Sequence, residues 1–187
     1  MSRRSKSLTK TEKHKEEEQQ MEGNYILSVL VENHAGVLSR VAGLFTRRGY
    51  NINSLSVGTT QDESISRITI AVKGDEQIIE QISKQVSKMI EVLKIKVLRE
   101  DELVCRELAL IKVKSTPKTR GEIMEITSIF RSKIVDVSQN TLTIEMSGNR
   151  KKLNAFLSMV EPYGVEEISR TGLTAIERGT NTLKLDK

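Results

Sequence analysis

The sequence predicts an α+β protein made of two consecutive βαββαβ units, and three observations support this prediction. Between Tyr25 and Leu98, strand-like and helix-like apolar patterns follow one another in the order strand, helix, strand, strand, helix, strand. The same order returns between Leu103 and Ile168, which indicates a structural repeat. Phe45 and Phe130 occupy comparable places in the two halves, each ahead of basic residues and a strand.

The composition agrees with two small domains. The 187 residues leave room for one ordinary domain or two small ones, and 37% of them are hydrophobic. Because the chain has only three Phe, three Tyr and no Trp, the cores must consist of Ile, Leu, Val and Met. Domains of about 75 residues bury only about 60% of their chain surface, so we expect them to pair with each other or with partner chains.

Charge and cysteine content exclude several classes of protein. The net charge is only +5, with both signs interspersed, which favours a solvated surface over a nucleic-acid footprint. The single cysteine, Cys105, excludes an intrachain disulfide and gives no argument for secretion. No apolar run approaches the roughly 20 residues of a membrane span, and no secretory signal is recognisable. A cytoplasmic location is expected; a plastid is the alternative, which the acidic run Glu16-Glu17-Glu18 disfavours.

Four segments are predicted along the chain. Residues 1–22 are polar and charged and are expected to form a disordered extension, with a frayed helix over residues 11–22 as the alternative. Residues 23–100 are predicted to form the first domain and residues 101–178 the second. Residues 179–187 are predicted to be a tail.

Each element of the first domain has its own signal. Strands are expected at Tyr25–Val31, Asn51–Val57, Ile65–Val72 and Val92–Leu98. The first helix has an apolar stripe at helical spacing, formed by Leu38, Val41, Ala42 and Phe45. This helix ends with the cations and glycine typical of a C-terminus: Arg47, Arg48 and Gly49. The second helix follows a predicted cap at Asp75, and its buried face consists of Ile78, Ile79, Ile82, Val86 and Met89.

The second domain repeats this order. Strands are expected at Leu103–Val113, Ile134–Val137, Leu142–Met146 and Val165–Ile168. The first helix is predicted from a capping box, Thr119 to Glu122, and from the apolar face Ile123, Ile126, Ile129 and Phe130. Gly148-Asn149 opens the second helix, whose face is Leu153, Phe156, Leu157 and Val160. The order βαββαβ is the ferredoxin-like arrangement, a four-stranded antiparallel sheet with two helices on one face. The chain after Gly172 is weakly patterned and is expected to be loose.

The turn between the first strand and the first helix is the most informative stretch. Gly36 lets the chain turn tightly, and the first N–H groups of the helix then lie unsatisfied in the turn and attract a carboxylate. The amide of Asn33 can add to such a site, and we expect the strand that begins at Asn51 to lie beside it. These residues predict a pocket for a small α-amino acid. The alternative is a plain strand-to-helix turn in which Asn33 satisfies local main chain.

Dispersed motifs in both domains resemble those of one family. The first domain contains Asn33-x-x-Gly36-Val37-Leu38, Leu44-Phe45, Arg47-Arg48-Gly49-Tyr50-Asn51-Ile52, Leu55, Ser66-Arg67, Gly74-Asp75 and Ile79-Glu80-Gln81-Ile82. The second contains Arg106-Glu107-Leu108, Phe130-Arg131, Ile134-Val135-Asp136-Val137 and Leu153-Asn154-Ala155-Phe156-Leu157. From Tyr25 to Arg178 the chain resembles the regulatory (small) subunits of acetolactate synthase, whose first domain is an ACT domain.

This resemblance implies an N-terminal ACT domain, a second ferredoxin-like domain and no catalytic site. It implies a homodimer that binds valine or a related branched-chain amino acid where the ACT domains meet. The implied effector-binding residues are Asn33, His34, Ala35, Gly36, Val37, Leu38, Asn51 and Ile52. Asn33 and Gly36 would hold the polar end of the ligand, and His34 and Ala35 would contribute main chain only. Asn51 would approach the ligand from a nearby position in the same chain or, alternatively, from the other subunit.

The resemblance also implies a partner. The chain would activate a separate catalytic (large) subunit and make it sensitive to feedback inhibition by valine, in the biosynthesis of valine, leucine and isoleucine. Thiamine diphosphate, Mg²⁺ and FAD are expected in that partner and no cofactor in this chain. No metal site, nucleic acid or membrane is expected to be bound here.

The residues alone disfavour three other classes of protein. RNA-recognition motifs share the βαββαβ order but need aromatic residues on the central strands, and the strand from Ile65 has none. An enzyme would need a nucleophile–base pair or a metal cluster, and Cys105 has no histidine placed to help it. A transcription regulator bearing an ACT domain is disfavoured because no helix-turn-helix pattern appears. Gly74-Asp75-Glu76 is better explained by a helix cap than by a cofactor motif.

Overall fold

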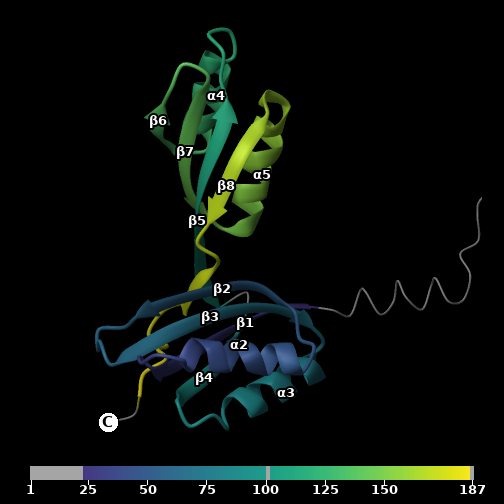
Figure 1. Cartoon of the computed structure of the whole chain (residues 1–187), viewed down its shortest axis with the longest axis vertical. Coiled ribbons are helices and arrows are strands. Elements are labelled where there is room, and N and C mark those ends of the chain that lie inside the picture. The colour runs from purple at the N-terminus through teal and green to yellow at the C-terminus, as the bar shows by residue number, and fades with distance from the viewer. Residues whose placement is uncertain (1–22, 100–101, 186–187) are drawn as a thin grey trace, which may run out of the picture. The chain divides into compact units, whose positions relative to one another are not determined.

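The computed structural model describes residues 23–99 and 102–185, which form two compact units (Figure 1). Of these residues, the first unit holds 23–53, 57–99 and 183–185, and the second holds 54–56 and 102–182. The predicted extension over residues 1–22 lies outside the described residues. Each unit has its own sheet and its own pair of helices.

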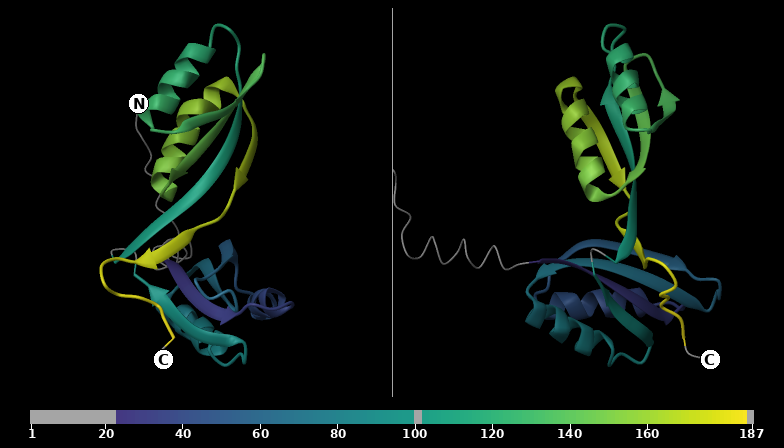
Figure 2. Two further views of the ribbon diagram at one scale, coloured as in Figure 1. Left: turned by 90° about the vertical axis from the view of Figure 1, so that its left-hand side faces the viewer. Right: turned by 180° about the vertical axis from the view of Figure 1, so that it is seen from behind.

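The first unit has the predicted βαββαβ order. Its elements are β1 (Gly23–Glu32), α2 (Val37–Arg47), β2 (Ile52–Thr59), β3 (Ile65–Gly74), α3 (Glu76–Val86) and β4 (Val92–Leu98). The strands form a four-stranded sheet in the order β2-β3-β1-β4, and β1 is antiparallel to both neighbours. Figures 1 and 2 show α2 and α3 on the same face of this sheet. The sheet is therefore covered by helices on one side only.

The central part of β1, from Leu27 to Val31, is buried throughout and contributes to the core of the first unit. Leu27, Val29 and Val31 are buried and pair in register with residues of β3, among them Ile68. The helices add a buried set to this layer: Val37, Val41, Leu44, Phe45, Ile79, Ile82 and Val86. Asp75 caps α3 as predicted, because its carboxylate accepts the Ile78 N–H at 2.7 Å.

Two predictions about these helices are wrong in detail. Leu38 does not belong to the buried stripe of α2, because its side chain is 41% exposed while that of Val37 is 2% exposed. The buried face of α2 is instead formed by Val37, Val41, Leu44 and Phe45, which recur at helical spacing from the first residue of the helix. Met89 lies beyond α3, which ends at Val86, so it sits in the turn that leads to β4.

A short segment near the C-terminal end of the chain also belongs to the first unit. Leu183 is only 7% exposed, and its main-chain carbonyl accepts a hydrogen bond from Arg67 Nη2 at 3.2 Å. The other guanidinium nitrogen of Arg67 donates to Ser28 Oγ at 3.3 Å, and Lys94 Nζ donates to the Lys184 carbonyl at 2.8 Å. The segment is thus held by side chains of β3 and β4. The predicted tail is ordered at these positions.

The second unit repeats the order and adds one strand. Its elements are β5 (Leu103–Lys114), α4 (Arg120–Ile129), β6 (Lys133–Val137), β7 (Thr141–Gly148), α5 (Arg150–Val160), a 3-10 turn (Glu161–Tyr163), β8 (Val165–Arg170) and β9 (Thr174–Glu177). The sheet order is β6-β7-β5-β8, and α4 and α5 cover one face of it (Figure 2). Its core is formed by residues buried between sheet and helices: Ala109, Ile111, Val113, Ile123, Ile126, Leu142, Ile144, Met146, Leu153, Phe156 and Val160.

Three expectations for the second unit need correction. The capping box is not formed, because Thr119 Oγ1 accepts the N–H of Thr116 and the Glu122 carboxylate accepts the hydroxyl of Tyr163. Ile129 is 69% exposed and lies outside the buried face of α4. The chain after Gly172 is not loose, because β9 pairs with residues 103–106 of β5 and buries Ala175.

Candidate functional site

The turn between β1 and α2 is built around Gly36. This residue is the N-cap of α2 and has φ +90° and ψ −17°, in the left-handed region that residues with a Cβ rarely adopt. A Cβ at this position would have space, since the nearest heavy atom, Arg40 Nη2, would be 3.9 Å away. Glycine is therefore required by conformation and not by crowding. The prediction that the chain turns tightly at Gly36 is confirmed.

The first N–H groups of α2 are open. The Arg40 N–H makes the first helical hydrogen bond, to the Gly36 carbonyl at 3.0 Å, and the Val37 N–H reaches the His34 carbonyl only at 3.5 Å. Within the described part of the chain, the N–H groups of Leu38 and Ser39 have no acceptor, and no side chain caps the helix. The first turn also contains no acidic residue. Such a helix start attracts an anionic group such as a carboxylate.

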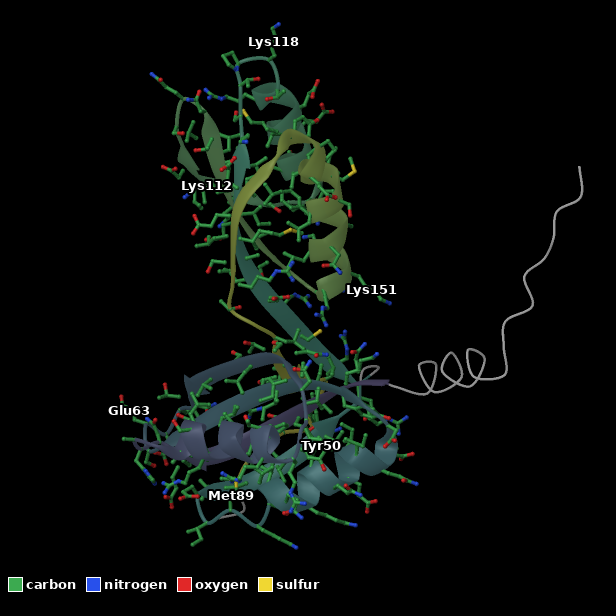
Figure 3. The ribbon with its side chains drawn as sticks, turned by 45° about the vertical axis from the view of Figure 1, so that its right-hand side comes forward. Tyr50, Glu63, Met89, Lys112, Lys118 and Lys151 are labelled. Carbon is green, nitrogen blue, oxygen red and sulfur yellow. The ribbon has the colours of Figure 1, made fainter. Side chains whose placement is uncertain are left out.

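Asn33 connects this turn to the hairpin loop between β2 and β3. Its main-chain N–H donates to the Ser64 carbonyl at 2.7 Å, and its Nδ2 donates to the Glu63 carbonyl, also at 2.7 Å. Its Oδ1 accepts the hydroxyl of Ser66 at 3.0 Å. Glu63 lies at one end of the first unit in Figure 3. Asn33 thus satisfies local main chain, as the plain-turn alternative expects, and still has one amide hydrogen and one Oδ1 lone pair for a ligand.

His34 and Ala35 contribute little with their side chains. His34 Nε2 is 3.0 Å from Glu32 Oε2, and His34 Nδ1 is 3.2 Å from the Ala35 carbonyl. The imidazole therefore bonds to the end of β1 and to its own turn. Val37 is buried against the core, so only its main chain is available to a ligand, whereas Leu38 exposes an apolar side chain close to the open N–H groups.

Asn51 and Ile52 lie at the other end of the first unit. The turn adjoins the end of β2, because Glu32 pairs with Ile65 and the Thr60 N–H donates to the Ile65 carbonyl at 2.9 Å. Asn51 precedes the start of β2, at the far end of α2, whose 11 residues span about 16 Å. In Figure 3 Glu63 is labelled at one end of this unit, and Tyr50, which precedes Asn51, is labelled well away from it. The expectation that Asn51 lies beside the turn is therefore wrong for residues of one chain.

Ser66 belongs to this site although it is not among the residues predicted for it. The signal was present, because Ser66 is a polar residue on the β3 face that otherwise carries Ile68, Ile70 and Val72. It is only 6% exposed, and a buried hydroxyl requires a hydrogen-bond partner. The alternation could not show that this partner is Asn33, because the two residues are far apart in the sequence.

The other candidates are explained by structure alone. Cys105 is a half-buried residue of β5, and Asp75 is a helix cap. Among residues 23–99 and 102–185, no three His, Cys, Asp or Glu residues are grouped closely enough to hold a metal ion. None of the helices in these ranges is long and apolar enough to cross a membrane.

Hydrogen bonds shift the pKa of two groups. In the hairpin loop, the Ser64 hydroxyl and main-chain N–H both donate to Asp62 Oδ1 and lower the pKa of that carboxyl. In the second unit, the bond from Tyr163 to the Glu122 carboxylate, at 2.9 Å, raises the pKa of the phenol. Asp62 therefore stays ionised and helps to hold the loop to which Asn33 is bonded.

Comparison with known proteins covers most of the chain. Residues 27–94 match the family model described as an AHAS small subunit-like ACT domain, and residues 106–179 match that of the small subunit of acetolactate synthase. A probable acetolactate synthase small subunit of Archaeoglobus fulgidus is 50% identical over 155 residues, which cover 83% of this chain and 97% of that protein. The acetolactate synthase small subunit of Mycolicibacterium smegmatis is 51% identical over 155 residues, covering 83% and 91%.

A solved structure agrees with both the fold and the sequence. The small subunit of acetolactate synthase from Thermotoga maritima is 43% identical and has a TM-score of 0.80. The match covers 85% of this chain and 99% of that chain. It includes both units, because a match of this extent cannot be confined to one of them.

Proposed function

Because the chain belongs to the acetolactate synthase small subunit family, as a non-catalytic regulatory subunit with an ACT domain, we propose that it binds valine or a related branched-chain amino acid. The proposed site is the turn before α2. Membership of the family implies a catalytic subunit as partner. The proposal adds that this chain activates that subunit and that the amino acid reverses the activation.

The open start of α2 is the observation that supports this site most directly. The free N–H groups of Leu38 and Ser39 suit the ligand carboxylate, since no acidic residue competes with it in the first turn. The spare N–H of Asn33 can join them, and its spare Oδ1 lone pair suits the ligand ammonium. The exposed side chain of Leu38 offers apolar contact to a branched side chain. These features match the three parts of a free aliphatic amino acid.

The proposal uses two copies of the chain to complete the site. β2 is an edge strand of its sheet, and antiparallel pairing of β2 with β2 of a second copy would set the start of one strand beside the end of the other. The end of β2 adjoins the turn, so Asn51 and Ile52 of one copy would approach Asn33 and Gly36 of the other. The site would then lie between subunits, where a bound ligand can favour one subunit arrangement.

Regulation follows from such a location. A ligand at an interface binds two arrangements of the subunits with different affinity, and a difference of about 1–3 kcal/mol is typical of allosteric coupling. We propose that thiamine diphosphate, Mg²⁺ and FAD act in the catalytic subunit and that this chain contributes no reacting group. The bacterial and archaeal origin of the relatives favours the cytoplasm over a plastid. RNA binding is not favoured, since β3 offers no aromatic side chain for stacking.

Calorimetric titration of the full chain with valine tests the site. Asn33→Ala should weaken binding by about tenfold or more, because it removes a donor aimed at a charged group. Asn154→Ala is the matched control, because Asn154 is an exposed asparagine on α5 of the second unit. Equal valine affinity in both variants would refute the proposed site. Titration of the catalytic subunit with the chain, with and without valine, then tests activation.

A further inference from the structure

We propose that Ser66 is a positioning residue, which holds the Asn33 amide in the orientation that the Glu63 carbonyl selects and thereby keeps its remaining N–H and lone pair in place for the ligand. The proposal rests on the proposed function, because it concerns the same amino-acid site. Nothing in the sequence pattern assigns Ser66 a role. Three groups are in contact here: the Asn33 side chain, the Ser66 hydroxyl and the Glu63 carbonyl.

The two hydrogen bonds of the Asn33 side chain define one orientation. The Glu63 carbonyl can only accept, so the amide nitrogen must face it, at 2.7 Å. The amide oxygen then faces Ser66 Oγ, which donates to it at 3.0 Å. Rotating the amide by half a turn would set two oxygens against each other at Glu63. The remaining N–H and the remaining lone pair therefore lie on defined sides of the amide.

Ser66 is the buried half of this arrangement. Its side chain is 6% exposed and projects from the core face of β3, where its register partner on β1 is Val31. Within the described residues its hydroxyl bonds to one side chain, that of Asn33. Asn33 is exposed, and the loop that holds Glu63 is exposed as well. Ser66 is thus the rigid point to which the amide is attached.

Loss of the Ser66 hydroxyl should free the amide without dismantling the turn. The main-chain bond from Asn33 to Ser64, at 2.7 Å, and the left-handed Gly36 do not depend on Ser66. With a single bond to Glu63 the side chain can rotate away, so the donor and acceptor would no longer be held for the two charged ends of an amino acid. The expected effect is on ligand recognition more than on folding.

The test compares Ser66→Ala with Ser115→Ala in the full chain. Ser115 is a matched control, because it is 1% exposed and its hydroxyl accepts Arg120 Nε at 3.2 Å in the second unit. We expect Ser66→Ala to weaken valine binding by about five- to tenfold in calorimetry, and Ser115→Ala to change it by less than about twofold. Valinamide lacks the carboxylate, so Ser66→Ala should weaken the binding of valinamide less than it weakens the binding of valine. Equal losses for the two variants, or equal losses for the two ligands, would overturn the proposal.

A second measurement separates this inference from the proposed function. Nuclear magnetic resonance relaxation of the Asn33 side-chain NH₂ group needs no ligand. We expect a restricted amide in the unmodified chain and a mobile one in Ser66→Ala. A mobile amide in the unmodified chain overturns the inference even where valine binds. If valine does not bind, but the Asn33 amide is restricted in the unmodified chain and mobile in Ser66→Ala, the proposed function is refuted and the inference about Ser66 stands. Ser66→Cys has a slightly larger side chain that donates only weakly, and its amide mobility should lie between those of the unmodified chain and Ser66→Ala. It replaces Ser66→Ala should that variant not fold.

Discussion

Arg67 Nη2 donates a hydrogen bond to the main-chain carbonyl of Leu183, 116 positions further along the chain. The same guanidinium donates to Ser28 Oγ, whose side chain is fully buried. One residue of β3 therefore joins the central strand of the first unit to a segment made after the whole second unit. This relationship gives the C-terminal segment a structural role that can be measured.

The Leu183 side chain should stabilise the first unit. Leu183→Ala removes a side chain that is 7% exposed, and we expect the free energy of unfolding to fall by about 2 kcal/mol. Leu185→Ala is the control, because Leu185 is 37% exposed and should cost less than about 0.5 kcal/mol. Urea denaturation, with hydrogen exchange of β1 and β3 to locate the effect, measures both. Equal costs for the two substitutions would contradict the assigned role of Leu183.

Arg131 has a strained main chain, and a glycine there should stabilise the second unit. It follows α4 with φ +52°, the one non-glycine residue with positive φ in the described residues. Arg131→Gly relieves this conformation, and the net gain should be about 0.5–1 kcal/mol after the added flexibility of the unfolded chain. Arg131→Ala keeps the Cβ and should give no gain. Thermal unfolding of the two variants distinguishes relief of strain from loss of the arginine charge.

Tyr163 should ionise at a higher pH than an unperturbed tyrosine. Its bond to Glu122 raises the pKa of the folded state above the ordinary value of 10.0. The folded chain therefore holds this proton more tightly than the unfolded chain, and the resulting stability is present below pH 10 and lost as the pH rises through the raised pKa. Glu122→Gln should bring the pKa of Tyr163 back toward its ordinary value. Ultraviolet titration against Tyr163→Phe isolates this phenol from Tyr25 and Tyr50, and an unchanged pKa in Glu122→Gln would exclude the carboxylate as the cause.

A site shared between two copies predicts complementation. Asn33→Ala and Asn51→Ala homodimers should each lose valine binding. In a heterodimer of the two variants, one site would hold both substitutions and the other would hold none. Random mixing of the two chains should therefore restore about a quarter of the valine sites of the unmodified protein. Calorimetry after refolding the variants together counts these sites, and no recovery would mean that the two asparagines do not act across an interface.

The sequence was sufficient for the order of elements because each strand and helix has its own period. A nearly continuous apolar run identified β1, alternation identified β3, and helical spacing identified α2 and α5. It was insufficient for β9, because this four-residue strand is too short to show alternation and is ordered only by pairing with β5. The prediction that Ile129 is buried was wrong because helical periodicity continues the apolar face of α4 into the exposed end of that helix.

The candidate site divides in the same way. Gly36 could be predicted because a strand-to-helix turn needs a residue that tolerates positive φ. The bonds from Asn33 to Glu63 and Ser66 could not, because they join positions that only the packed sheet brings together. The position of Asn51 could not be predicted either, because α2 carries the chain about 16 Å away from the turn before β2 begins.

The return of residues 183–185 to the first unit has a consequence for how the protein is made. A ribosome releases a chain from its N-terminus at about 5–20 residues per second, and domains usually fold as they emerge. β1 to β4 of this protein are synthesised long before Leu183 and Lys184, whose carbonyls accept from Arg67 and Lys94. The nascent first unit must therefore wait, without these acceptors, until the entire second unit has been translated.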